Sequence, residues 1–169
     1  MRFFCPIGAL ILAVLPGAGA LRAQEWGPAQ FLIGHWIGTG SGQPGTATGD
    51  FSFTPDLAGK VLVRRSFADY PASADKPASR HEDLMVLFHE GSTGELRAVY
   101  FDSEDHVIHY TGKASPGGLI FASDGKSEEV RYRLSYTRTG NDTLKLEFAV
   151  APPGKDFTSY LQATARRGE

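Results

Sequence analysis

A repeated rhythm of short apolar stretches and turn clusters runs from Trp36 to the end of the chain and most constrains its fold. The stretches are rich in Val, Leu, Phe, Tyr and Thr. The breaks, such as Gln43-Pro44-Gly45 and Pro152-Pro153-Gly154, hold many of the twenty glycines and ten prolines, which supply the backbone angles of tight hairpins. The pattern predicts ten strands, near residues 36–42, 49–54, 60–69, 82–89, 95–101, 105–111, 118–122, 128–138, 143–150 and 157–166.

Alternation within the later strands predicts one dry face and one wet face. Leu144, Leu146 and Phe148 share one side of their strand, whereas Lys145 and Glu147 share the other. Because nearly all connections are short, successive strands should be antiparallel neighbours. The pattern therefore favours an all-β fold, an antiparallel up-and-down barrel of about ten strands. A two-sheet sandwich with the same hairpin rhythm is the alternative.

Two segments depart from this rhythm. Residues 27–33 are the helix candidate, because Pro28 suits a first helical turn and Gly34 suits its end. This short helix would cap one end of the barrel. Residues 70–80 hold two prolines among small polar residues, which predicts an irregular, exposed loop placed to act as a lid beside the barrel mouth.

The N-terminus has the order of a secretory signal peptide. Arg2 precedes an apolar run over residues 3–15, and small residues follow, which predicts cleavage after Ala20 or Ala23. The run is short for a permanent membrane anchor, although an uncleaved anchor is the alternative. We therefore expect a signal peptide over residues 1–20, a single β-barrel domain over residues 26–167, and a periplasmic or secreted protein without a membrane anchor after processing.

Cysteine content and charge narrow the chemistry. Cleavage would remove Cys5, the only cysteine, so the mature chain would have no disulfide and no thiolate ligand or nucleophile. The 17 Lys and Arg residues and the 19 Asp and Glu residues give a formal net charge of −2, and the basic residues are scattered. Nucleic acid is not an expected partner, because binding it needs clustered basic residues. The oligomeric state stays open.

Residues 31–40 have the sequence FLIGHWIGTG, which follows the pattern F-L-x-G-x-W-x-G-x-G. This segment resembles the opening of calycin-like barrels. Over residues 30–167 the chain is similar in pattern to nitrobindin-like and lipocalin-like bacterial domains of unknown function. The resemblance implies a first strand that bends at its glycines, with Trp36 as a plug at the closed end. It also implies that Arg166 or Arg167 stacks on the indole.

The same resemblance raises haem as a cofactor, because nitrobindin-like proteins bind haem through a histidine on their last strand. The equivalent residues 159–166 contain no histidine. Tyr160 is the alternative ligand there, since a phenolate can ligate ferric iron. Haem binding is therefore not carried over, and no cofactor is expected.

The histidine spacing argues against a metal site. His106 and His109 form H-x-x-H, but residues three apart on a strand point to opposite faces, so the two cannot share an ion without a bulge. We expect His35 to be partly buried and hydrogen-bonded, and His81 and His89 to be solvated. The sequence therefore predicts no metal ligands.

Tyr100, Asp102 and His106 are the first candidates for contacting a ligand. They form a polar cluster across a predicted hairpin, which suits hydrogen bonds to a ligand or acid-base chemistry. Residues 102–105 also fit a plain polar turn. Tyr132, on the apolar face of a later strand, is a further candidate polar anchor.

Arg65 is the last candidate, because it shares a strand face with Val61, Val63 and Phe67. If that face is interior, a guanidinium is buried and needs an anionic partner or ligand. In the alternative, the strand is bulged and both Arg64 and Arg65 point outward.

The sequence favours ligand binding over catalysis. It carries no G-x-S-x-G, no H-E-x-x-H and no glycine-rich phosphate loop, and no residue is assigned a catalytic role. We expect a lipocalin-like barrel that binds a small, mostly apolar molecule in its interior. One alternative is an enzyme, either with acid-base chemistry at Tyr100, Asp102 and His106 or with atypical haem-dependent chemistry on nitrogen oxides or peroxide. The other is a structural module with a filled interior.

Overall fold

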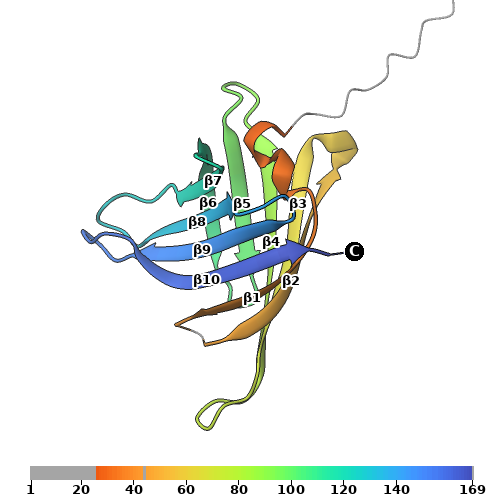
Figure 1. The fold of residues 1–169 in the computed structure, drawn as a ribbon. Helices are drawn as coiled ribbons and strands as arrows, with labels where there is room; N and C mark the ends of the chain where they lie inside the picture. The colour runs from red at the N-terminus through yellow and green to blue at the C-terminus, as the bar shows by residue number, and fades with distance from the viewer. Residues whose placement is uncertain (1–25, 44, 169) are drawn as a thin grey trace, which may run out of the picture.

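The computed structural model describes residues 26–43 and 45–168, and in this part of the chain ten antiparallel strands close into one barrel (Figure 1). Each strand pairs with its sequence neighbours, and β1 pairs with β10 to close the sheet. The strands are β1 (Gly34–Gly42), β2 (Ala47–Asp56), β3 (Val61–Tyr70), β4 (Ser79–His89), β5 (Leu96–Asp102), β6 (Val107–Ser115), β7 (Gly118–Ser123), β8 (Arg131–Arg138), β9 (Thr143–Ala151) and β10 (Thr158–Arg167). The up-and-down barrel is confirmed, and the sandwich alternative is wrong.

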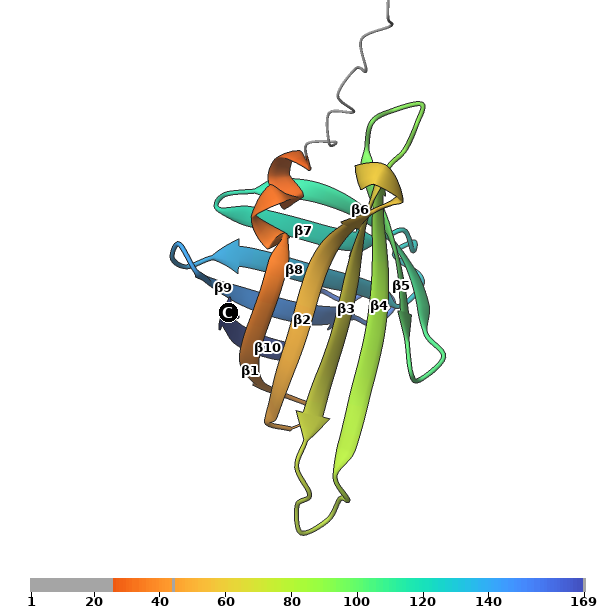
Figure 2. The same cartoon turned by 90° about the vertical axis from the view of Figure 1, so that its right-hand side faces the viewer.

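The two ends of the barrel differ. The 3-10 helix η1 (Gly27–Leu32) lies at one end and contacts β7, while the β3–β4 loop projects from the opposite end (Figure 2). Proline stands in the first turn of η1, as the sequence predicted. A second 3-10 turn, η2 (Leu57–Gly59), joins β2 to β3. Among the described residues, no helix is long and apolar enough to cross a membrane.

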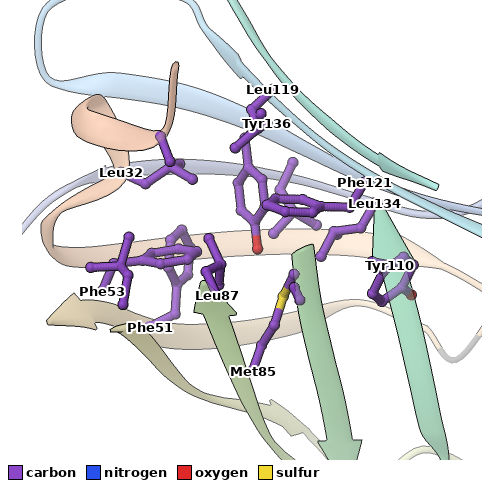
Figure 3. Packing of buried hydrophobic residues seen from close by; sticks show 14 of the residues in the cluster. Leu32, Phe51, Phe53, Met85, Leu87, Tyr110, Leu119, Phe121, Leu134 and Tyr136 are labelled. Atoms are coloured by element: carbon purple, nitrogen blue, oxygen red, sulfur yellow. The ribbon is translucent and has the colours of Figure 1, made fainter. Parts of the chain in front are cut away.

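The core fills the end that η1 covers (Figure 3). Trp36 is 1% exposed, and its Nε1 donates a hydrogen bond to the carbonyl oxygen of Leu32 over 2.8 Å, which ties β1 to η1. The Arg167 guanidinium lies 4.4 Å from the centre of the Trp36 ring and donates to the carbonyl oxygen of Ile33 over 2.9 Å. Arg167 is therefore the stacking residue, whereas Arg166 is exposed.

Several strand boundaries differ from the predicted ones, most clearly around the β3–β4 loop and at the start of β8. The β3–β4 ladder continues to the pair Tyr70 and Ser79, so the irregular segment covers residues 71–78 and is shorter than expected. Two hydrogen bonds of 2.6 Å from the Arg80 side chain to the Asp69 carboxylate join the two strands near this end of the ladder. Strand β8 begins at Arg131, because the preceding residues form a turn. The predicted signal peptide lies outside the described residues.

Candidate functional site

A cavity of about 600 Å³ opens at the end of the barrel opposite η1, and its two walls differ in chemistry. The apolar wall comes from β8, β9 and β10 and includes Tyr132, Leu134, Leu146, Phe148, Val150 and Leu161. The polar wall comes from β3, β4, β5 and the turn after β5, and includes Arg64, Ser66, His81, Asp83, Tyr100, Asp102, Glu104 and His106. These strand groups lie across the barrel from each other.

Small inward-facing residues keep this half of the barrel open. Gly38 and Gly40 of β1 line the cavity together with Ala163 and Ala165 of β10. Gly40 pairs with Ala163, and a Cβ atom added at Gly40 would lie 3.0 Å from the Cβ of Ala163. The first strand therefore approaches β10 closely without filling the space between the two walls.

Aromatic rings form the outer part of the apolar wall. Tyr132 and Phe148 stack with ring centres 5.9 Å apart and planes 9° apart. Tyr160 meets Phe148 edge-on at 6.0 Å. Tyr132 thus lines the cavity, as expected from the sequence.

Arg64 and Asp83 form an ion pair at the inner end of the polar wall. The Arg64 side chain donates to the Asp83 carboxylate and, over 3.0 Å, to the hydroxyl of Ser66. Burial alone would lower the pKa of Arg64, but the Asp83 carboxylate and the hydroxyl of Tyr136 raise it, and the net direction is upward. The guanidinium is therefore charged, and the charge of Asp83 balances it.

The expectation that Arg65 faces the interior is wrong, and so is the alternative with both arginines outside. Arg64 pairs with Phe53 of β2, which is buried in the core. Paired residues of neighbouring antiparallel strands share one face, so Arg64 points inward and Arg65 is exposed. Val63 and Phe67 suggested the opposite orientation, but both lie half-buried on the outer face.

The structure brings Tyr100, Asp102 and His106 together at the mouth. The Asp102 carboxylate accepts hydrogen bonds from the His106 ring over 2.9 Å and from the backbone N–H groups of Glu104 and His106, each over 3.0 Å. The Tyr100 hydroxyl lies 3.4 Å from the same carboxylate. Asp102 is thus both a member of the polar cluster and the residue that holds the turn.

The ionisation of these groups follows from their surroundings. Burial alone would raise the pKa of Asp102, but its hydrogen bonds to His106 and Glu104 lower it below its usual range. Burial raises the pKa of Tyr100 far above its ordinary value, and the neighbouring Asp83 adds to this effect. At neutral pH the cavity therefore presents a charged carboxylate beside a neutral phenol.

Sequence reasoning missed His81 and Glu104. The expectation that His81 is solvated is wrong, because its side chain is only 24% exposed. Its Nε2 lies 3.1 Å from the Tyr100 hydroxyl, and its Nδ1 lies 2.8 Å from Oε2 of Glu104. Alternation was the available signal, since His81 shares a strand face with Met85 and Leu87, which are both fully buried.

The two histidines of the H-x-x-H pattern do not share a site. His109 is exposed and lies apart from the cavity lining, so His106 and His109 face different surroundings.

Lys76 of the β3–β4 loop lines the mouth of the cavity. The loop therefore lies where the sequence predicted a lid.

The inner face of β10 does not fit a haem ligand of the expected kind. Its cavity-lining side chains beyond the irregularity between Ser159 and Leu161 are Leu161, Ala163 and Ala165, none of which coordinates iron. Tyr160, at the irregularity, is 39% exposed and packs edge-on against Phe148.

No family model and no curated protein matches this sequence. Among solved structures, the chain is similar to Rv2717c from M. tuberculosis, with a TM-score of 0.57, 17% identity, and coverage of 82% of this chain and 94% of that one. It is also similar to the S-type phycobiliprotein lyase CPES from Guillardia theta, with a TM-score of 0.50, 11% identity, and coverage of 83% and 90%. At these identities the likeness concerns the fold, and the chain has the fold of a calycin-like, lipocalin-like barrel.

Proposed function

We propose that this barrel binds a small, mostly apolar molecule that carries polar atoms along one edge. The cavity supports this function most directly, because it has an apolar aromatic wall and a hydrogen-bonding wall facing each other. Ligand sites in proteins share this composition, with apolar lining for affinity and a few polar groups for orientation. The volume of about 600 Å³ lies within the range usual for such sites.

The polar atoms available to a ligand define its expected chemistry. Tyr100 offers a neutral hydroxyl, while Asp102 and Glu104 offer carboxylate oxygens at the mouth. Arg64 is already engaged by Asp83 and Ser66. The polar edge of the ligand should therefore carry hydrogen-bond donors, and its body should be flat enough to lie against Tyr132.

The open cavity also argues against a structural module with a filled interior. The core is dense only at the end covered by η1, whereas Gly40 and Ala163 leave the other half open. We also propose, from the signal-like N-terminus, that the mature protein acts in the periplasm or outside the cell.

A cavity-filling variant tests the binding function. Ala163→Phe should place a ring in the cavity, whereas Thr164→Phe, the next residue on β10, is exposed and serves as the control. Binding of a neutral, environment-sensitive dye such as Nile red is measured by fluorescence titration, with folding checked by circular dichroism. We expect Ala163→Phe to weaken dye binding at least about tenfold, which corresponds to about 1.4 kcal/mol.

Two results would overturn the proposal. One is equal dye affinity in folded Ala163→Phe and in the parent protein, which would place the dye outside the cavity. The other is an absence of dye binding together with native mass spectra that show no co-purified molecule.

Acid-base catalysis is a second candidate, favoured by the contacts that join Tyr100, Asp102 and His106 at the cavity mouth. Here His106 would exchange protons with a bound substrate, oriented by its 2.9 Å contact to Asp102. Any turnover found with a captured ligand should fall in His106→Ala and persist in His109→Ala. Unchanged turnover in His106→Ala would exclude this candidate.

A further inference from the structure

Residues from two strands and a turn bring imidazole and carboxylate groups together at the cavity mouth. His81 comes from β4, Asp102 ends β5, and Glu104 belongs to the turn after β5. Each offers one ligand atom, and these three atoms all lie within 4.8 Å of one another. Two ligands on one tetrahedral zinc ion lie about 3.3 Å apart, so only small side-chain movements would be needed to share an ion.

The register of β4 and β5 explains this arrangement. Asp83 pairs directly with Asp102, so His81 lies two residues further along β4, opposite the turn that carries Glu104. The hydrogen bond of 2.9 Å from the Ser103 N–H to the Glu82 carbonyl oxygen continues the pairing into the turn. The backbone therefore places His81 and Asp102 on the inner face of the barrel, with Glu104 in the turn beside them at the mouth, before any ion binds.

Charge at this place is unbalanced when the imidazoles are neutral. Asp83 and Asp102 are opposite each other across the two strands, an arrangement that is unfavourable for like charges. Their side chains are each only 5% exposed. The Arg64 guanidinium balances the charge of Asp83, and Glu104 adds a further carboxylate close to His81.

Other cations near the mouth do not remove this imbalance. Arg80 is engaged in two hydrogen bonds with Asp69. Lys76 is exposed on the β3–β4 loop. The carboxylates at the mouth thus carry more negative charge than Arg64 balances, and a bound metal ion would offset it.

We propose that His81, Asp102 and Glu104 bind a divalent transition-metal ion such as Zn²⁺. A mixed set of one imidazole and two carboxylates suits zinc better than calcium or magnesium, which prefer oxygen ligands alone. Three protein ligands leave a coordination position toward the cavity, as in open zinc sites. His106, which contacts Asp102, is placed to orient that carboxylate. This site goes beyond the proposed binding of an apolar molecule, with which it shares Asp102 and Glu104, and it does not require that molecule to bind.

Titration of the full-length, untagged protein with Zn²⁺ tests the site. Isothermal calorimetry and competition with a chromogenic chelator give stoichiometry and affinity, and the absorption of Co²⁺ in the visible range reports its coordination. We expect one equivalent of Zn²⁺ and at least about 100-fold weaker binding in His81→Ala, a larger effect than the loss of an outer-shell partner. Glu104→Gln keeps the shape of a side chain that is 55% exposed, so it tests the site without risk to the fold.

His109→Ala is the matched control, because His109 is an exposed histidine on the neighbouring strand β6. The proposal holds if this variant binds Zn²⁺ like the parent while His81→Ala and Glu104→Gln lose it together with the Co²⁺ absorption. Unchanged binding in His81→Ala would overturn it. So would the absence of stoichiometric Zn²⁺ binding to the parent protein. The dye experiment with Ala163→Phe probes the apolar wall, so failure of one proposal is distinguishable from failure of the other.

Discussion

Arg64 and Asp83 form an ion pair at the inner end of the cavity, with side chains that are 7% and 5% exposed. Asp83 pairs with Asp102 along β4 and β5, so the same carboxylate meets a guanidinium on one side and a like charge on the other. Burying such a pair costs desolvation, and its net contribution to stability is small unless one partner is lost.

Breaking this pair should destabilise the barrel strongly. Asp83→Asn leaves the Arg64 guanidinium buried without its counter-charge, and we expect the free energy of unfolding to fall by about 3–5 kcal/mol in urea denaturation. Arg65→Met, on the outer face of the same strand, should change it by no more than about 0.5 kcal/mol. Equal losses in both variants would contradict the assignment of Arg64 as the interior arginine.

The contact between Arg167 and Trp36 should stabilise the covered end of the barrel. Arg167→Ala removes the guanidinium from the indole and from the carbonyl oxygens of Ile33 and Phe31. We expect a loss of about 2 kcal/mol from the cation-π contact and the charged hydrogen bonds together. Arg166→Ala is the control, because Arg166 is exposed. Thermal denaturation of both variants measures the difference, and a larger effect at Arg166 would refute the expectation.

Removing the hydroxyl of Tyr136 should stabilise the protein. Its side chain is fully buried, and its hydroxyl lies near the Arg64 guanidinium without a well-formed hydrogen bond to any residue that the structure describes. Figure 3 shows the hydroxyl directed away from Leu119 and into the packed core. Because an unpaired buried hydroxyl is costly, Tyr136→Phe should raise the free energy of unfolding by about 1 kcal/mol. A loss of similar size would show that this hydroxyl makes a favourable bond in solution.

Alkaline pH should destabilise the barrel through the same residue. Burial raises the pKa of Tyr136 to about 12, while the Arg64 guanidinium acts in the opposite direction. A group whose pKa is raised by folding stabilises the folded state below its unfolded pKa, which is about 10 for tyrosine. This stabilisation is lost as the pH rises from there through the folded pKa.

Denaturation series at about pH 8 and about pH 11 should show this loss of stability, because tyrosine begins to ionise between these two values. Tyr136→Phe should lose less stability than the parent over that interval. Absorbance at about 295 nm follows phenolate formation, and the part that is missing in Tyr136→Phe reports Tyr136 and should rise together with unfolding. A full tyrosine titration in a protein that stays folded would contradict the expectation.

Local sequence patterns predicted most of the fold. The alternation of Leu144 and Leu146 with Lys145 has one physical solution, a strand with one buried face, and short turns then force antiparallel neighbours. The inward face of strand β3 could not be predicted in this way, because Val63 and Phe67 on one side and Leu62 on the other make both faces apolar. Only pairing with the buried Phe53 of β2 decided that Arg64 points inward.

The sequence by itself determined the strands, their order and the short helix that covers one end, because these depend on residues close together in the chain. The tertiary structure alone decided how the side chains of the cavity are brought together. His81 and Glu104 are separated by more than twenty positions, and only the register of β4 with β5 brings their ligand atoms to 2.8 Å. Closure of β1 on β10 likewise joins Gly40 to Ala163 and leaves the space open. Pairing across a closed sheet is non-local, so no local pattern could specify it.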